Sequence, residues 1–418
     1  MVISRDKYLN RLISHKHNGL IKIITGIRRC GKSFLLFELF RSHLLSIGVS
    51  ESHVIKIELD DRRNKALRDP DKCLEYVTGL LKDDAMYYLL IDEVQYMSEF
   101  EDVLNSFLHI RNLDTYVTGS NSKFLSTDII TEFRGRGDEI HVRPLSFAEY
   151  CSVYPDLAWD DAWNAYHTFG GLPYTVLLDS DEEKVKYLRR LFEEVYMKDI
   201  IERNHVQNDL QLGILLDIIS SNIGSLTNPQ KLENTFKSSG KSQLSAVTIK
   251  QYIDYFIDAF MIEKAERYDI KGKKYITTPQ KYYFSDLGLR NARLNFRQQE
   301  ETHIMENIIY NELRGRGYSV DVGVVEINER GDNGKYARKQ IEIDFVANKG
   351  SQRYYIQSAF ALPSEEKVFQ EERPLKNVAD AFKKIVVVKD NIMLRRDENG
   401  IVTMGLKQFL LNPESLDL

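Results

Sequence analysis

The chain has 418 residues, of which 43% are hydrophobic and 28% are charged, and its net charge at pH 7 is −5. This composition is typical of a globular protein with about two to four domains, and the weakly negative charge excludes a global basic field that attracts nucleic acid or membranes. No apolar stretch reaches the roughly 18 residues of a membrane span, and the three cysteines lack metal-site spacing, so we expect a cytoplasmic protein with reduced thiols.

A glycine-rich loop lies between the first two predicted elements. Residues 21–25 (IKIIT) are typical of a buried strand and residues 34–40 (FLLFELF) of an apolar helix, while residues 26–33 (GIRRCGKS) fit the P-loop pattern. In such a loop the glycines let successive N–H groups point at phosphate oxygens. We expect Lys32 to neutralise the β- and γ-phosphates of a nucleotide and Ser33 to bind Mg²⁺. The other residues expected to contact the nucleotide here are Gly26, Arg28, Arg29, Cys30, Gly31 and Phe34.

An acidic pair follows the next strongly predicted strand. Residues 86–91 (MYYLLI) are continuously apolar or aromatic, as in a central parallel strand, and Asp92 and Glu93 come directly after them. Ligands of parallel sheets bind at the carboxyl ends of the strands. We therefore predict that Asp92 holds Mg²⁺, directly or through water, and that Glu93 is the general base for an attacking water.

Polar and basic residues follow the next predicted strand. Residues 115–119 (TYVTG) lead into Ser120 and Asn121, either of which is placed to contact the γ-phosphate or the lytic water. Arg134 and Arg136 then lie in a glycine-containing segment. One of them serves as an arginine finger that contacts the γ-phosphate bound by a neighbouring subunit, or both are solvated charges. Arg136 is the stronger candidate for an arginine finger.

These motifs, together with residues 143–150 (RPLSFAEY), resemble those of AAA-type ATPases of bacteria and archaea that carry a carboxy-terminal region of obscure function. The resemblance covers nearly the whole chain. It implies an α/β fold with a P-loop NTPase parallel sheet over residues 1–160, and ATP and Mg²⁺ as ligands. It also implies that the polar residue after residues 115–119 is a sensor and that Arg136 is a finger, which requires a homo-oligomer.

A helical lid is predicted over residues 161–207. Its turn at residues 170–173 (GGLP) is similar to the Gly-x-Pro turn that some signalling ATPases place against the nucleotide. Pro173 is then a nucleotide contact, and the alternative is an ordinary turn between two helices. A charged helical run follows from about residue 182 to residue 203.

Residues 208–295 are predicted to form a winged-helix-like domain. A helical stripe precedes a hairpin with a basic tip at residues 267–276 and a strand at residues 281–284. Such modules often bind DNA, with the wing contacting phosphates. Because Asp254 and Asp258 on the helix repel phosphates, packing against protein is the alternative to DNA binding.

The last region, residues 296–418, resembles the PD-(D/E)XK nuclease core in its order of elements. The sequence predicts a helix at 304–313, strands at 318–325, 341–347 and 354–357, a helix near 378–382 and a strand at 385–388. Glu306, Asp344 and Gln357 match positions of that core, but Ala359 stands where its lysine is expected, and Lys367 is only a weak replacement. Because the lysine orients water and offsets charge at the phosphate, we expect a degenerate, inactive α/β domain used for binding or assembly.

The leading interpretation is a Mg²⁺-dependent ATPase in which ATP binding and hydrolysis reposition the carboxy-terminal domains, with DNA or a protein client as partner. The alternative is a nucleic-acid-binding protein in which ATP is a conformational latch with negligible turnover. A third interpretation, an ATP-gated nuclease, is the weakest because Ala359 replaces the lysine.

Overall fold

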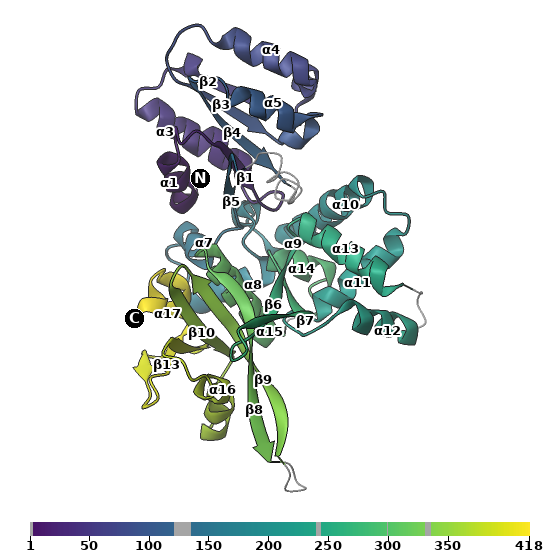
Figure 1. Cartoon of the computed structure of the whole chain (residues 1–418), viewed down its shortest axis with the longest axis vertical. Helices are drawn as coiled ribbons and strands as arrows, with labels where there is room; N and C mark the ends of the chain where they lie inside the picture. Colours follow the sequence, from purple (N-terminus) through teal and green to yellow (C-terminus); the bar gives the residue numbers. More distant parts are fainter. Residues whose placement is uncertain (1–2, 121–134, 240–243, 299, 331–335) are drawn as a thin grey trace. The chain divides into compact units, whose positions relative to one another are not determined.

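The computed structural model describes residues 3–120, 135–239, 244–298, 300–330 and 336–418 (Figure 1). The chain forms two compact units, the first comprising Met1–Pro144, Leu172–Tyr174 and Asp258–Phe260, and the second comprising Leu145–Gly171, Thr175–Ile257 and Met261–Leu418. No helix within the described ranges combines the length and the apolar character that a bilayer crossing needs. The finer division at residues 160, 207 and 295 remains a prediction.

The first unit is built on a parallel sheet with the strand order β2-β3-β4-β1-β5. Its strands are β1 (Ile21–Thr25), β2 (Val54–Glu58), β3 (Tyr87–Asp92), β4 (Leu113–Gly119) and β5 (Gly137–His141). β1, β3 and β4 are buried along their whole length, as the continuous apolar run of β3 predicts for a central strand. Since β4 lies between β3 and β1 and all three are parallel, the loops after them begin at one edge of the sheet. This arrangement confirms the predicted α/β P-loop NTPase fold.

Helices cover both faces of this sheet (Figure 1). They are α1 (Asp6–Ser14), α2 (Lys32–Phe34), which continues through a π-helical segment (Leu35–Phe40) into α3 (Arg41–Ser46), α4 (Pro70–Leu80) and α5 (Phe100–Phe107). On one face, α4 and α5 pack residues such as Val77 and Phe107 against Leu89 and Val117 of the strands. Each such side chain stabilises the fold by about 1.5–3 kcal/mol on burial. On the other face, the rings of Phe40 and Tyr116 lie 4.6 Å apart.

The second unit begins with helices. They are α7 (Phe147–Val153), α8 (Trp159–Phe169), α9 (Asp181–Leu191), α10 (Lys198–Arg203), α11 (Asp209–Ser221), α12 (Pro229–Ser239), α13 (Ala246–Asp258) and α14 (Leu287–Arg293). A π-helical segment, Phe192–Met197, joins α9 to α10, so the predicted charged helical run is present. Ser146 and Ser180 form capping boxes that fix where α7 and α9 begin.

An eight-stranded sheet completes the second unit, with the order β12-β13-β11-β10-β9-β8-β6-β7. Its strands are β6 (Ile262–Asp269), β7 (Lys274–Phe284), β8 (Ser319–Arg330), β9 (Tyr336–Lys349), β10 (Gln352–Ala359), β11 (Lys383–Val388), β12 (Arg395–Arg396) and β13 (Val402–Gly405). The helices among them are α15 (Glu301–Gly315), α16 (Glu365–Lys376) and α17 (Leu406–Leu411). Because β6 pairs in parallel with β8, the predicted wing hairpin is part of the carboxy-terminal sheet.

Two details of the second unit differ from the sequence-based predictions. The second arm of the hairpin and the strand predicted at residues 281–284 form one strand, β7, which tolerates Pro279 because it lies at the edge of the sheet. The helix predicted near residues 378–382 is wrong, because α16 lies earlier in the chain, where Ser364 caps its first turn by accepting from the N–H of Lys367. The predicted order of helix, three strands, helix and strand is present as α15, β8, β9, β10, α16 and β11.

Candidate nucleotide site

The loop after β1 is curled by residues with positive φ angles. Gly26, Arg29 and Gly31 have φ values of 139°, 65° and 98°, and α2 begins at Lys32 directly after them. A Cβ atom at Gly26 would lie 2.1 Å from the main-chain oxygen of Val142, so only glycine fits at this point. The strand, the curled loop and the helix therefore have the arrangement that a P-loop requires.

Lys32 places its charge inside this curl. Its Nζ donates to the main-chain oxygens of Gly26 at 2.9 Å and Ile27 at 3.1 Å, and the side chain is buried. The thiol of Cys30 donates to the main-chain oxygen of Val142 at 3.3 Å, and burial raises its pKa. Cys30 is thus a packed small residue, and Lys32 is the cation that the loop offers to a ligand.

Asp92 connects the end of β3 to the beginning of the P-loop helix. The Oγ of Ser33 donates to Oδ1 of Asp92 at 3.0 Å, although 59 residues separate them in the chain. Burial raises the pKa of Asp92 to about 6, while hydrogen bonds from Thr118 and Ser33 act against this rise. A hydroxyl and a carboxylate oxygen are hard ligands of the kind that Mg²⁺ prefers, so these two residues fit the predicted metal site.

Glu93, directly after Asp92, has a left-handed backbone with a φ of 53°. Its Oε2 accepts a hydrogen bond from Oγ of Ser120 at 3.0 Å and another from Nε2 of Gln95. The Nε of Arg28, in the P-loop, donates to Oγ of Ser120 at 3.3 Å. A chain of hydrogen bonds therefore leads from the P-loop through Ser120 to the carboxylate that the sequence predicts as the general base.

Two residues of this arrangement were missed by the sequence analysis. Thr118, fully buried on β4, donates its hydroxyl to Asp92 and accepts from the N–H of Glu93 at 2.9 Å, so it positions both acids. Gln95 holds Glu93 from the following turn. The sequence signal for both was weak, since threonine is an ordinary strand residue and Gln95 is a single glutamine between Val94 and Tyr96 that belongs to no motif.

Pro173 and Phe34 lie at the periphery of the P-loop. A Cβ atom at Gly31 would lie 3.7 Å from Cγ of Pro173, so the predicted lid turn reaches the loop. Phe34 is 39% exposed at the beginning of the helix. Both positions are therefore available to a nucleotide held by the loop.

The structure says less about the roles of Asn121, Arg134 and Arg136 at the nucleotide site. The main-chain oxygen of Arg136 accepts from the N–H of Ile21 at 3.0 Å, and the residue is exposed. Asn121 and Arg134 lie outside the described residues. The structure thus leaves Arg136 on the surface of the first unit, where a neighbouring molecule has access to it.

The predicted nuclease-like residues meet in the second unit. Glu306, Asp344 and Gln357 are each 7–9% exposed, and the N–H of Asp344 donates to Oε1 of Gln357 at 3.4 Å. Ala359 is buried in the apolar core on the sheet, and Lys367 pairs with Glu371 at 2.5 Å. The cation nearest to Glu306 and Asp344 among the described residues is another lysine, Lys281 of β7, which the sequence analysis did not single out.

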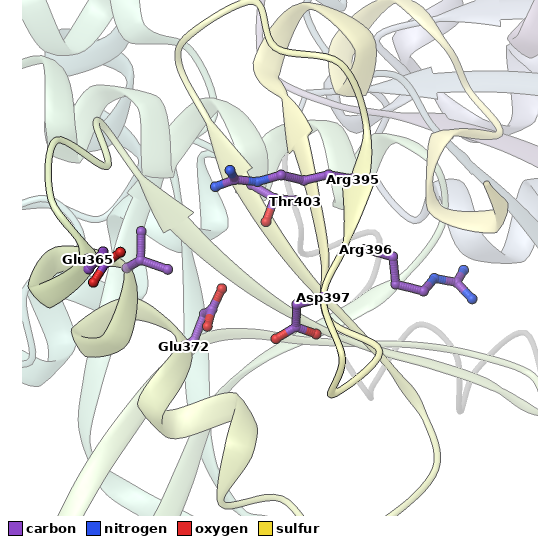
Figure 2. Close-up of a pocket in the computed structure, with 7 residues that line it drawn as sticks. Glu365, Glu372, Arg395, Arg396, Asp397 and Thr403 are labelled. Atoms are coloured by element: carbon purple, nitrogen blue, oxygen red, sulfur yellow. The ribbon is translucent and has the colours of Figure 1, made fainter.

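A surface cavity of about 360 Å³ lies elsewhere in this unit (Figure 2). It is lined by Glu365, Val368, Glu372, Arg395, Arg396, Asp397 and Thr403. The side chains of Arg395 and Arg396 point in different directions, and Glu372 pairs with Lys376 at 2.8 Å. The cavity mixes both signs of charge and contains none of the predicted site residues.

The fold and the site define an AAA-type P-loop ATPase, and comparison with known proteins agrees. The sequence model of a family described as "AAA domain" matches residues 18–151, and a model described as a domain of unknown function matches residues 160–300. An uncharacterized protein of Haemophilus influenzae is 32% identical over 391 residues, which are 92% of this chain and 93% of that protein. The chain belongs to this family of AAA-type P-loop ATPases.

Other relatives are more distant. The uncharacterized protein MJ1544 of Methanocaldococcus jannaschii is 26% identical over 407 residues, covering 94% of this chain and 84% of that protein. The Aeropyrum pernix ORC1 protein, solved in complex with DNA, is 12% identical with a TM-score of 0.32, covering 71% of this chain and 93% of that chain. The assignment to the class therefore depends on the AAA match and the site geometry.

Proposed function

We propose that this protein binds ATP with Mg²⁺ and hydrolyses it, and that these steps reposition the carboxy-terminal part of the chain. The observation that supports the proposal most strongly is the convergence on Asp92. Ser33 from the P-loop helix and Thr118 from β4 both donate to Oδ1 of its carboxylate at the end of β3. Residues from three separate elements thus form one oxygen-lined site beside the buried ammonium of Lys32.

Each residue has a distinct role in this proposal. Lys32 and the N–H groups of the curled loop bind the phosphates. Ser33 and Asp92 hold Mg²⁺, which neutralises charge on the phosphates when it is bound. Glu93 accepts the proton of the attacking water, and Ser120 orients Glu93 while standing close enough to the P-loop to respond to the γ-phosphate.

Two substitutions in the full-length chain test the proposal. Lys32→Ala should lose ATP binding in calorimetry, and Glu93→Gln should keep binding but lower phosphate release by about 10²–10⁴-fold, because it removes the base and keeps the side-chain size. Glu99→Gln makes the same change at an exposed position in the next turn and should hydrolyse ATP as the unmodified protein does. Unchanged ATP affinity in Lys32→Ala, or turnover near the unmodified rate in Glu93→Gln, would refute the assigned roles.

DNA is the proposed partner of α11, α12, α13 and the β6–β7 hairpin. The segment between α11 and α12 pairs with the hairpin through Thr227 and Gln280, whose N–H and C=O groups exchange two hydrogen bonds of 2.9 Å. Three helices followed by a hairpin that pairs in this way are the arrangement of a winged helix. The exposed tip carries Lys271, Lys273 and Lys274, which are suited to phosphate contacts.

A salt titration of DNA binding tests this partner. With labelled duplex DNA, Lys273→Ala should reduce the slope of log affinity against log salt by about 1, whereas Lys65→Ala in the first unit should not change it. Identical slopes in the two variants would exclude the hairpin tip as the contact. Tight, strongly salt-dependent binding with very slow ATP turnover would favour the latch alternative.

The remaining parts of the proposal concern the organisation of the chain. We retain the lid at residues 161–207 and the separate winged-helix-like and nuclease-like parts that follow it. A cytoplasmic location agrees with the free thiols of Cys30, Cys73 and Cys151. A homo-oligomer is required if Arg136 serves the nucleotide of a neighbouring copy.

A further inference from the structure

A lysine lies at the centre of the carboxylate cluster in the second unit. The Nζ of Lys281, on β7, is 2.8 Å from Oε1 of Glu306, 2.6 Å from Oε1 of Glu342 and 3.8 Å from Oδ1 of Asp344. Lys281 itself is only 4% exposed. Glu306 belongs to α15, and Glu342 and Asp344 belong to β9, so two separate elements direct three carboxyl groups at one ammonium.

The sequence pattern explains how these groups face one another. Residues two apart on a strand point to the same face, which places Glu342 and Asp344 together on β9 and Lys281 and Tyr283 together on β7. The hydroxyl of Tyr283 donates to Oε1 of Glu306 at 2.6 Å, the same oxygen that Lys281 contacts. The shared face is the one that α15 covers with Glu306.

Backbone groups close the cluster from the sides. The N–H of Ser358 donates to Oδ2 of Asp344 at 2.8 Å. A Cβ atom at Gly224 would lie 3.1 Å from Oε2 of Glu306, so the chain before α12 packs directly onto this carboxylate. Glu306 and Asp344 are therefore held in the interior of the unit, whereas the side chain of Glu342 is partly exposed.

The pKa shifts of Lys281 and Asp344 indicate that Lys281 is the cation of the cluster. Burial alone lowers the pKa of Lys281, but the carboxylates of Glu306, Asp344 and Glu342 outweigh burial and raise it. Burial and the charge of Glu306 raise the pKa of Asp344 to about 8, which keeps this carboxyl largely protonated at neutral pH. Lys281 thus stays charged at neutral pH within this cluster of acidic side chains.

We propose that the ammonium of Lys281 occupies the position of a divalent cation in the nuclease-like region, so that this region is held together by an internal lysine and does not cleave phosphodiesters with a metal ion. Three oxygen-bearing side chains surround Nζ in the way that carboxylates surround a hard cation. Among the described residues no group of three His, Cys, Asp or Glu side chains is arranged to hold a metal ion.

Lys281 is not placed as a catalytic lysine supplied by a different strand. A catalytic lysine would stand beside the metal and reach the scissile phosphate. Lys281 instead lies between Glu306 and Glu342, within hydrogen-bond distance of both, and its side chain is buried together with that of Glu306. Its position therefore competes with the metal for the same oxygen atoms.

Titration with MnCl₂ in the absence of nucleotide tests the proposal. The full-length chain carries Asp92→Asn throughout, so that the P-loop site lacks the carboxylate proposed to hold its metal ion. We expect no Mn²⁺ site that depends on Asp344 while Lys281 is present. Lys281→Met, which removes the charge and keeps most of the volume, should bind one Mn²⁺ per chain at least about tenfold more tightly, and adding Asp344→Asn should abolish this site.

Two controls accompany the Mn²⁺ titration. Lys281→Arg keeps a cation in place and should not gain the Mn²⁺ site, and circular dichroism checks that every variant is folded. A folded Lys281→Met chain without a new site would overturn the proposal. So would an Asp344-dependent Mn²⁺ site, or Asp344-dependent plasmid nicking, in the chain that retains Lys281, and these two measurements decide the question even if Lys281→Met fails to fold.

Discussion

The hydroxyl of Thr118 should be a determinant of both stability and Mg²⁺–ATP affinity. Thr118→Val replaces Oγ1 with a methyl group of similar size. The change removes the hydrogen bond donated to Oδ1 of Asp92 and leaves the N–H of Glu93 without its acceptor. Because Asp92 is 5% exposed, water cannot freely replace the lost donor.

The expected magnitude follows from these two interactions. A hydrogen bond to a charged group contributes about 1.5–3 kcal/mol, and an unsatisfied buried N–H costs about 1–3 kcal/mol. Since the N–H of Glu93 is only partly buried, we expect a combined loss of about 2–4 kcal/mol in the local free energy of unfolding. The misplaced carboxylate of Asp92 should also weaken Mg²⁺–ATP binding by about tenfold, which corresponds to about 1.4 kcal/mol.

Hydrogen exchange and calorimetry measure these effects. Both tryptophans, Trp159 and Trp163, lie in the second unit, so their fluorescence does not report on the first unit. Exchange of the amides of β3 and β4, followed by mass spectrometry, reports its local unfolding directly.

A matched substitution on the same strand is the control. Thr115 is also buried on β4 but lies on the opposite face, which Leu113 and Val117 place against the apolar core. Thr115→Val should therefore leave Mg²⁺–ATP affinity unchanged and alter local stability little. Equal effects of Thr115→Val and Thr118→Val on exchange and affinity would refute the reasoning.

Three further predictions concern other parts of the chain. Gly26→Ala should abolish ATP binding in calorimetry, because its Cβ would lie 2.1 Å from a main-chain oxygen at a φ of 139°, and normal affinity would contradict this. The pKa of Asp344 is raised to about 8 in the folded chain. The contribution of this group to stability is therefore fully present when the pH is below the pKa of an aspartate in the unfolded chain, and it is lost as the pH rises through 8. Urea unfolding followed by tryptophan fluorescence should show that the unmodified protein loses up to about 1.4 kcal/mol per pH unit relative to Asp344→Asn between about pH 4 and 8, and parallel profiles would exclude the shift. The ATPase rate per subunit should rise with protein concentration and lose that dependence in Arg136→Ala, whereas a rate independent of concentration would argue against a shared site.

The nucleotide site could be predicted from sequence because its residues follow directly on recognisable strands. Ser33 and Asp92 each occupy a position fixed by a local pattern, and parallel strands bring such positions to one edge without further information. Thr118 could not be predicted in the same way. Its role depends on the register of β4 beside β3, and nothing in its own sequence environment distinguishes it from other buried strand residues.

The carboxy-terminal sheet shows where local patterns were insufficient. The apolar residues Val378 and Phe382 suggested a helix, but the side chain of Asp380 accepts from the N–H of Phe382 and forms a turn before β11. The true helix, α16, begins after Ser364 and is strongly charged, so its apolar periodicity is weak. The pairing of β6 with β8, which joins the hairpin to this sheet, is a contact between distant segments that no local pattern encodes.

The role of Lys281 depends on its position in the folded chain and not on its distance from other residues along the sequence. The sequence motif places its lysine two positions after Gln357, where Ala359 stands, but a lysine on β7 reaches the same carboxylates from another strand. The same strand begins with Lys274 at the exposed tip. The two lysines are seven positions apart, which corresponds to about 23 Å along a strand, so the exposed tip of β7 is well separated from the carboxylate cluster at its other end.

This separation makes a final prediction. Lys281→Met should lower the stability of the second unit, because it leaves Glu306 and Glu342 without their cation, yet it should not change the salt dependence of DNA binding. Lys273→Ala at the tip should do the reverse. The two variants are to be compared in the same salt titration and the same urea unfolding experiment. If Lys281→Met reduced the salt slope as much as Lys273→Ala does, the ammonium would have to be accessible to phosphate, and the internal position that defines its role would be wrong.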